Sequence, residues 1–252
     1  MTAADVVLLV VAGFGAGLSG SMAGLASLIS YPALLSVGLP AVAANVTNTV
    51  ALTANALGSA ASSRVELRGQ SARLLRFAPV VLVGGATGAW LLLVTPPEAF
   101  ERIVPVLIAA ASLALLLQPW LRPAAHPGAR ASRAGSIAIA VCVFAVSVYG
   151  GYFGAAAGVL LLALLVVGLP VSLLQGNALK NILLGVTNAV AAVAFALLGP
   201  VHWAAAAALA AGVLVGSYAG PAVARRVPAT ALRVAVGFLG LGLAAVLAIE
   251  TY

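Results

Sequence analysis

The chain has 252 residues, of which 63 % are hydrophobic and 7 % are charged. Because soluble domains carry about 25 % charged residues, this composition excludes a soluble protein and indicates an integral membrane protein. The formal net charge of +7 does not point to nucleic acid, since the basic residues lie in short segments between apolar runs, where the positive-inside rule accounts for them.

Apolar runs of roughly 17 to 25 residues, the length of a membrane helix, recur along the whole chain. The first run leads into a stretch that glycines interrupt, and a short run then ends at Gly38-Leu39-Pro40. The next helix carries polar side chains on one arc and is followed by a loop rich in arginine. The segments expected in the first half are 3–18, the interrupted stretch 17–24, then 25–37, 41–62, 77–94 and 103–117.

The polar segment 118–135 holds several arginines and prolines and has the composition of a linker. We therefore divide the chain into a first transmembrane repeat (1–120), a cytoplasmic linker (121–135) and a second transmembrane repeat (136–252), which together form one membrane domain. The segments expected in the second half are 136–149, the glycine stretch 151–158, a short run to 168, the helix 173–198, a span containing Gly216 and Gly220, and 234–249.

Three motifs occur in the same order in both halves at a spacing of about 132 residues, which indicates an internal duplication. The first is an interrupted glycine stretch, the second is Gly-Leu-Pro, and the third is a pair of glycines four residues apart. They lie at 17–24 and 151–158, at 38–40 and 168–170, and at Gly84/Gly88 and Gly216/Gly220.

Each copy has five apolar segments, so the second copy should enter the membrane from the opposite side, as in transporters built from inverted repeats. If the arginine loop 64–76 is cytoplasmic, ten of the 12 basic residues fall on the cytoplasmic side and both termini lie outside. The sequence therefore predicts an all-α polytopic membrane protein of two inverted-topology repeats, with about 8–10 helical segments.

The second segment of each copy is short. As a helix, 158–168 spans about 15 Å, roughly half of the hydrocarbon core. The first two segments of each copy therefore either form a re-entrant hairpin broken at the glycines or cross separately, and both choices keep the crossings odd. Broken helix ends offer free N–H groups to an anion, although glycine pairs such as Gly20/Gly24 are also typical of close helix packing alone.

The helix 173–198 carries Lys180, the only lysine of the chain. At 100° per residue, Asn177, Asn181 and Asn188 lie within about 40° of one another beside it. A lysine at a helix centre costs about 2.5–3.5 kcal/mol on insertion scales, so Lys180 should face protein or water. One ammonium among carboxamides suits a small anion; the alternative is that Lys180 snorkels and the asparagines only hold helices together.

Several of these motifs resemble the TauE/SafE sulfite exporter family. They include the glycine-broken segment before Gly-Leu-Pro, Asn45-Val-Thr-Asn-Thr-Val-Ala-Leu in the first half, and Asn177-Ala-Leu-Lys-Asn181 in the second. Tyr149-Gly-Gly-Tyr-Phe-Gly154 and Pro200-Val-His-Trp203 are similar as well. The resemblance implies an inner-membrane transporter of two related halves that moves sulfite, organosulfonates or other small anions. The Gly-Gly-Gly core common in that family is replaced by Ser-Met-Ala-Gly24 and Ala-Ala-Ala-Gly158.

Other chemistries fit the sequence poorly. Gly17-Leu-Ser-Gly20 matches a short motif of intramembrane serine proteases, but the second copy has no serine and no base is evident. The five carboxylates fall at termini or in loops, so we expect no enzyme, and two isolated histidines with one cysteine, Cys142, predict no metal site or disulfide. We expect Cys142 to be a packing residue. A passive anion channel and a membrane scaffold without transport are the alternatives to a carrier.

We therefore expect a multi-pass transporter of the bacterial inner (plasma) membrane that moves a small anion by alternating access, without a cofactor. Its partners are the anionic substrate and the lipid bilayer, not nucleic acid, and association of identical chains is left open. No carboxylate is expected to couple transport to protons. The residues expected to bind the substrate are Lys180, Asn177, Asn181, Asn188, Asn48, Thr49 and Asn55.

Overall fold

A computed structural model describes residues 1–117, 133–224 and 229–251. These residues form helices joined by short turns, and no strand occurs among them. The linker predicted at 121–135 lies almost entirely outside the described residues. The helices are α1 (Ala3–Ala23), α2 (Ala26–Ser36), α3 (Ala41–Ser62), α4 (Arg64–Leu67), α5 (Ser71–Val94), α6 (Pro97–Leu117), α7 (Arg133–Tyr152), α8 (Ala157–Gly168), α9 (Leu173–Leu198), α10 (Trp203–Ala224) and α11 (Ala229–Thr251).

Six of the described helices are long and apolar enough to cross a membrane. They are α1, α5, α6, α7, α9 and α10, while α2 and α8 are shorter apolar helices. Many large apolar side chains on their outer faces are exposed, such as Leu75, Trp90 and Leu197. In a bilayer such faces contact lipid rather than water. The prediction of an all-α membrane protein is therefore confirmed.

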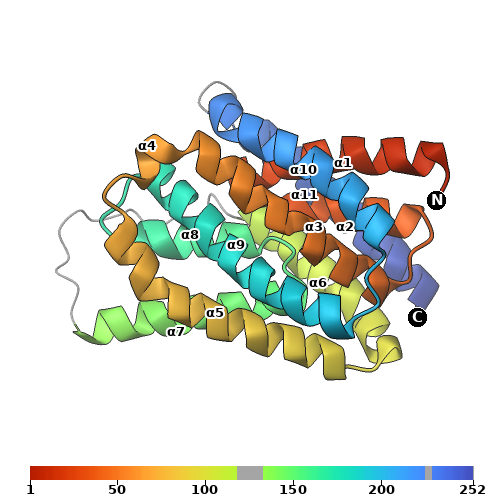
Figure 1. Cartoon of the computed structure of the whole chain (residues 1–252). Coiled ribbons are helices and arrows are strands. Elements are labelled where there is room, and N and C mark those ends of the chain that lie inside the picture. The colour runs from red at the N-terminus through yellow and green to blue at the C-terminus, as the bar shows by residue number, and fades with distance from the viewer. Residues whose placement is uncertain (118–132, 225–228, 252) are drawn as a thin grey trace.

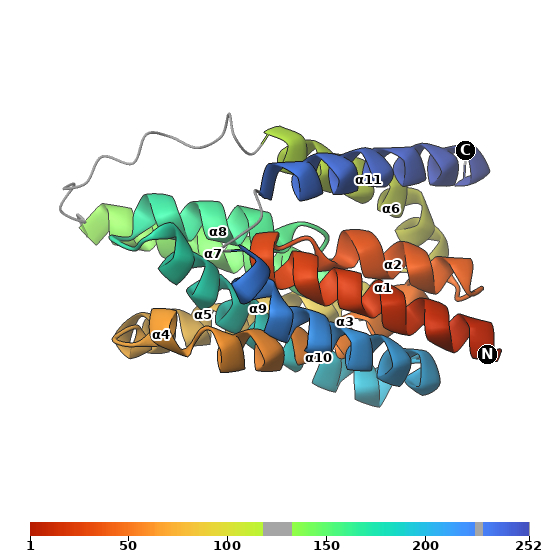
Figure 2. The same cartoon turned by 90° about the horizontal axis from the view of Figure 1, so that it is seen from above.

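Two helical hairpins enter the bundle from opposite ends (Figures 1 and 2). One consists of α1 and α2, the other of α7 and α8. The chain reverses between α1 and α2 at Gly24, whose φ of 80° lies in the left-handed region that favours glycine. The two turns meet inside the bundle, where a Cβ on Gly24 would lie 2.5 Å from the carbonyl carbon of Gly158. The re-entrant alternative stays a prediction, because α1 alone is long and apolar enough to cross a membrane.

Several boundaries differ from the sequence predictions, and the loop expected at 64–76 holds helix α4 and the first turns of α5. We expected glycines to break the first helix between 17 and 24, but α1 continues to Ala23 and only Gly24 ends it. Gly13 and Gly17 lie inside the helix, where an added Cβ would meet carbonyl oxygens of α10, so they serve close packing. We also placed Glu98 and Glu101 in a loop, but α6 begins at Pro97 and includes both.

Neighbouring helices pair in a pattern that stays the same when the two halves are exchanged. Helix α1 packs on α10 as α7 packs on α5, and α3 packs on α10 as α9 packs on α5. The two self-related pairs are α3 with α9 and α6 with α11. An internal duplication with a pseudo-two-fold axis produces such a pattern. The opposite orientation of the two copies in a membrane stays a prediction.

The polar helices α3 and α9 run side by side in opposite directions through the middle of the bundle (Figure 1). Both chain termini lie at the end where α3 begins, and α4 lies at the other end (Figure 1). Cys142 is exposed on α7, so our expectation that it packs inside the protein was wrong. In the membrane its side chain faces outward from the bundle.

The first testable prediction concerns which end of the bundle is cytoplasmic. In a Cys142→Ala background, a cysteine at Arg68 should react with a membrane-impermeant thiol reagent only from the cytoplasm, and one at Val201 only from outside. Arg68 follows α4, whereas Val201 lies between α9 and α10 at the opposite end. Labelling of both positions from one side would contradict the inverted arrangement.

Candidate functional site

The end of α1 is held by side chains of α9. Lys180 is fully buried, as predicted, and its Nζ donates to the carbonyl oxygen of Gly20 at 2.9 Å. Asn177 and Asn181 both donate through Nδ2 to the carbonyl oxygen of Ser21, at 2.7 and 3.0 Å. The last carbonyls of a helix carry the negative end of the helix dipole, and Gly20 O also accepts from the backbone N–H of Gly24 at 2.9 Å. The lysine and the asparagines therefore cap α1 from the other half of the chain.

A related contact holds the end of α7. Asn45 of α3 donates through Nδ2 to the carbonyl oxygen of Tyr152 at 2.8 Å. Asn45 precedes Asn177 by about 132 residues, the spacing of the sequence repeat. Helix α3 thus binds the end of α7, and α9 binds the end of α1, so each polar helix binds the first helix of the hairpin in the opposite half. Asn48, which corresponds to Lys180, turns instead to α2 and donates to Ser27 Oγ at 3.2 Å.

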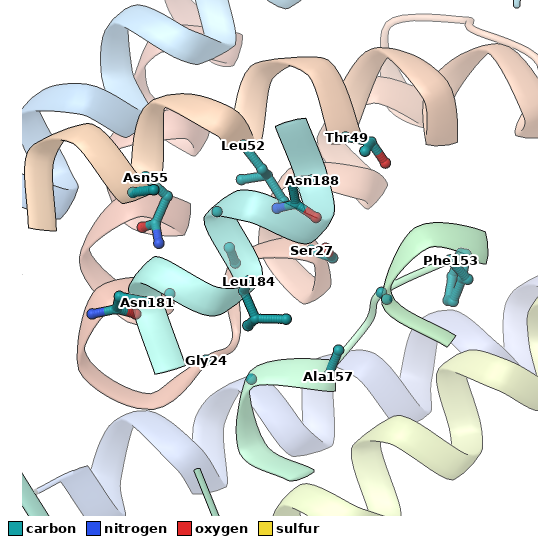
Figure 3. Close-up of a pocket in the computed structure, with 17 residues that line it drawn as sticks. Gly24, Ser27, Thr49, Leu52, Asn55, Phe153, Ala157, Asn181, Leu184 and Asn188 are labelled. Carbon is teal, nitrogen blue, oxygen red and sulfur yellow. The ribbon is translucent and has the colours of Figure 1, made fainter. Parts of the chain in front are cut away.

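A cavity of about 40 Å³ lies where the two hairpin turns meet α3 and α9 (Figure 3). Asn55 and Asn181 lie on one side of it, and Thr49 and Phe153 lie on the other (Figure 3). Asn188 projects from α9 between them. The cavity is therefore built by segments from both halves of the chain.

Two helix N-termini border this cavity. Ala26 and Ser27 begin α2, and Ala157 and Gly158 begin α8; all four line the cavity. The first N–H groups of a helix have no partner inside it, and the dipole makes this end positive. None of the described residues that line the cavity has a carboxylate or a cationic side chain. The arrangement of two positive helix ends and several carboxamides attracts an anion and can donate hydrogen bonds to it.

Lys180 stands just behind the cavity wall. Gly20 lines the cavity, and its carbonyl oxygen accepts the hydrogen bond from Lys180. Gly20 thus separates the ammonium group from the cavity. Both lie in the protein interior, where charges are weakly screened. The field of the ammonium favours a negative charge in the cavity, although the side chain itself contacts helix α1.

The structure brings four of the seven predicted site residues to the cavity. These are Thr49, Asn55, Asn181 and Asn188. Lys180, Asn177 and Asn48 lie beside it and bind the hairpins instead. Sequence reasoning placed the site where the broken segments meet the two polar helices, but it did not name the residues of those segments that line the cavity, such as Ser27 and Phe153. The glycine breaks marked these turns, but the sequence does not show which residues next to a break face the centre.

Aromatic rings pack behind one wall of the cavity. Phe153 lines the cavity, and its ring meets Tyr31 edge to face with centroids 5.3 Å apart. Phe100 of α6 lies 6.1 Å from the same ring. All three side chains are buried. Edge-to-face pairs of this kind are a preferred packing of aromatic rings, so Phe153 is held by a buried aromatic cluster on this side of the cavity.

The histidines and acidic residues do not gather at the site. Among the described residues no group of His, Cys, Asp and Glu could hold a metal ion. His202 lies before α10, where its Nδ1 accepts from the backbone N–H of Ala205 at 3.2 Å. It acts as a cap for that helix. His126 lies outside the described residues.

Comparison with known proteins identifies the family. No curated protein and no solved structure matches the chain. The family model described as sulfite exporter TauE/SafE matches residues 9–247, nearly the whole chain. This chain therefore belongs to the TauE/SafE sulfite exporter family of membrane transporters.

Proposed function

We propose that the protein carries a small oxyanion, such as sulfite or an organosulfonate, across the inner (plasma) membrane by alternating access. The observation that carries this proposal is the cavity between the N-termini of α2 and α8, lined by Asn55, Asn181 and Asn188. Two helix N-termini, carboxamide groups and a nearby buried ammonium favour an anion over a cation. Membership in a sulfite exporter family supports the same substrate class.

The size of the cavity supports a small substrate. A volume of about 40 Å³ exceeds the minimum of about 10–15 Å³ that one water needs, but leaves room for few further atoms. Small oxyanions have several acceptor oxygens on one central atom, so they can meet donors from α2, α8 and α9 together. In this proposal the carboxamide Nδ2 groups of Asn55 and Asn188 donate to the anion.

The pairing of the helices supports a carrier mechanism. The cavity lies between two pseudo-equivalent hairpins, and transporters built from repeats bind substrate at broken helices near the repeat interface. Movement of one set of helices against the other would open the cavity to each side in turn. A passive channel would instead give fast, unsaturable flux in liposomes, and a scaffold would give none.

The second prediction tests the cavity. Asn55→Ala and Asn188→Ala should each weaken binding of sulfite by about 10- to 100-fold, since a hydrogen bond to a charged group contributes about 1.5–3 kcal/mol. Affinity is measured by sulfite competition in counterflow with purified protein in liposomes. Thr187→Val is the matched control, because Thr187 is buried on α9 beside Asn188 but bonds to Leu183 of its own helix. Unchanged affinity in both alanine variants would place the substrate elsewhere.

A further inference from the structure

The C-terminal ends of α1 and α7 both accept hydrogen bonds from side chains of the opposite half, but only the end of α1 is bound by a charged group. At the end of α1, the ammonium of Lys180 donates to Gly20 O. At the end of α7, Asn45 donates to Tyr152 O. The counterpart of Lys180 in α3 is Asn48, which is neutral and bonds to α2 rather than to α7. Lys180 therefore brings a cation to the end of α1, whereas its counterpart Asn48 brings none to the end of α7.

An unpaired oxygen lies at the end of α7. Asn45 is fully buried, and its Oδ1 has no hydrogen-bond partner among the described residues. Asn177 Oδ1 at the end of α1 is unpaired as well, so the two ends differ in the ammonium of Lys180 and not in the free oxygen. The hydrogen bond from Nδ2 to Tyr152 O fixes the orientation of the carboxamide. The unpaired Oδ1 of Asn45 is therefore held next to the end of α7. A buried acceptor without a partner is costly. The last carbonyls of α7 add the negative end of a helix dipole at this place.

The available ligands indicate the class of ion. They are a carboxamide oxygen and main-chain carbonyl oxygens, which are hard and neutral. Calcium and magnesium sites in proteins normally include carboxylates, and neither Asn45 nor the turn 152–156 brings one. Unwound carbonyls and helix C-terminal ends do coordinate alkali ions in transporters with broken helices.

We infer that Asn45 Oδ1 and the carbonyl end of α7 bind a monovalent alkali cation, which neutralises α7 as Lys180 neutralises α1. The site adjoins the anion cavity. Thr49 lines the cavity and donates to the carbonyl oxygen of Asn45 at 3.0 Å, and Phe153 lines it directly after Tyr152. A cation held here favours an anion in the cavity, so the ion is a candidate for co-transport. This goes beyond the proposed function, which names no coupling ion.

The cation site is tested on the purified full chain by thermal unfolding in sodium, potassium and choline chloride at equal concentration. One alkali ion should raise Tm over choline by about 3–6 °C when present at about ten times its Kd, and the rise should saturate. Asn45→Ala should abolish this difference. Asn177→Ala is the matched control, since Asn177 is the counterpart of Asn45 at the end that has Lys180, and it should keep the difference.

Equal Tm of the wild type in the three salts would overturn the cation site, as would a difference that Asn45→Ala retains. If Asn45→Ala does not fold, binding of radioactive sodium or potassium to the wild type decides: saturable binding near one ion per chain supports the site, and its absence overturns it. These results are separate from the anion measurements. Loss of sulfite binding would remove the proposed function and leave the cation effect in place.

Discussion

Replacing Lys180 by methionine should weaken anion binding by about 10- to 100-fold and leave the protein folded. Lys180 is the only lysine, is fully buried, and lies one residue behind the cavity wall. Methionine has a similar length but no charge, so the variant removes the field of the ammonium and retains most of the packing. Removing a charge from the interior also relieves its desolvation cost, which offsets the lost hydrogen bond to Gly20.

Two further variants separate charge from shape. Arg76→Met removes a cation from an exposed position and should leave anion binding unchanged. Lys180→Arg keeps the charge, but a planar guanidinium is larger than an ammonium and should not fit a fully buried place against Gly20. Binding is measured by sulfite competition in counterflow, and folding by thermal unfolding. Normal anion affinity in Lys180→Met would show that the lysine only caps helix α1.

Replacing Gly24 by alanine should lower the free energy of unfolding by about 2–5 kcal/mol. Two costs add. A left-handed residue other than glycine costs about 1–2 kcal/mol, and Gly24 has φ 80°. The new Cβ would also lie 2.5–2.8 Å from Gly158 and Val159 backbone atoms, and such overpacking costs about 1–3 kcal/mol.

Two glycines separate these costs. Gly38 has φ 85° and no atom near its Cβ position, so Gly38→Ala should show only the conformational cost. Gly158 has an ordinary φ, and its Cβ would lie 2.5 Å from the Cα of Gly24, so Gly158→Ala should show only the packing cost. Stability is compared by thermal unfolding in one detergent. If Gly24→Ala is no worse than Gly38→Ala, the two hairpin turns do not touch as described.

The contact between the turns has a consequence for transport. Gly24 and Gly158 belong to different halves and touch beside the anion cavity. Glycines also bring two pairs of helices into close contact, namely α1 with α10 and α5 with α7. We treat each of these pairs as one packed unit. Backbone contacts of this kind make rigid units. Alternating access, as proposed, would therefore move these units against each other at the Gly24–Gly158 contact.

The sequence by itself determined the membrane class and the polar helix 173–198, whose bounds coincide with α9, and it predicted two duplicated halves with which the helix pairing agrees. These features depend on apolar length, on motif spacing and on helical periodicity, which are local properties of the chain. Lys180 was correctly placed in the protein interior, because burying it against protein is the less costly choice. The duplication also predicted that short segments follow the glycine breaks.

Only the tertiary structure decided which polar groups share the cavity. Lys180 and Asn181 are neighbours in sequence, yet Asn181 lines the cavity whereas Lys180 binds Gly20. Their roles depend on where α1 ends. Helix α1 continues through its glycines although glycine has a low helix propensity, and Gly13 and Gly17 fit closely against α10. The contact between Asn45 and Tyr152 joins residues far apart in the chain. Periodicity assigns a face to each helix, but the packing of the two halves determines what that face meets.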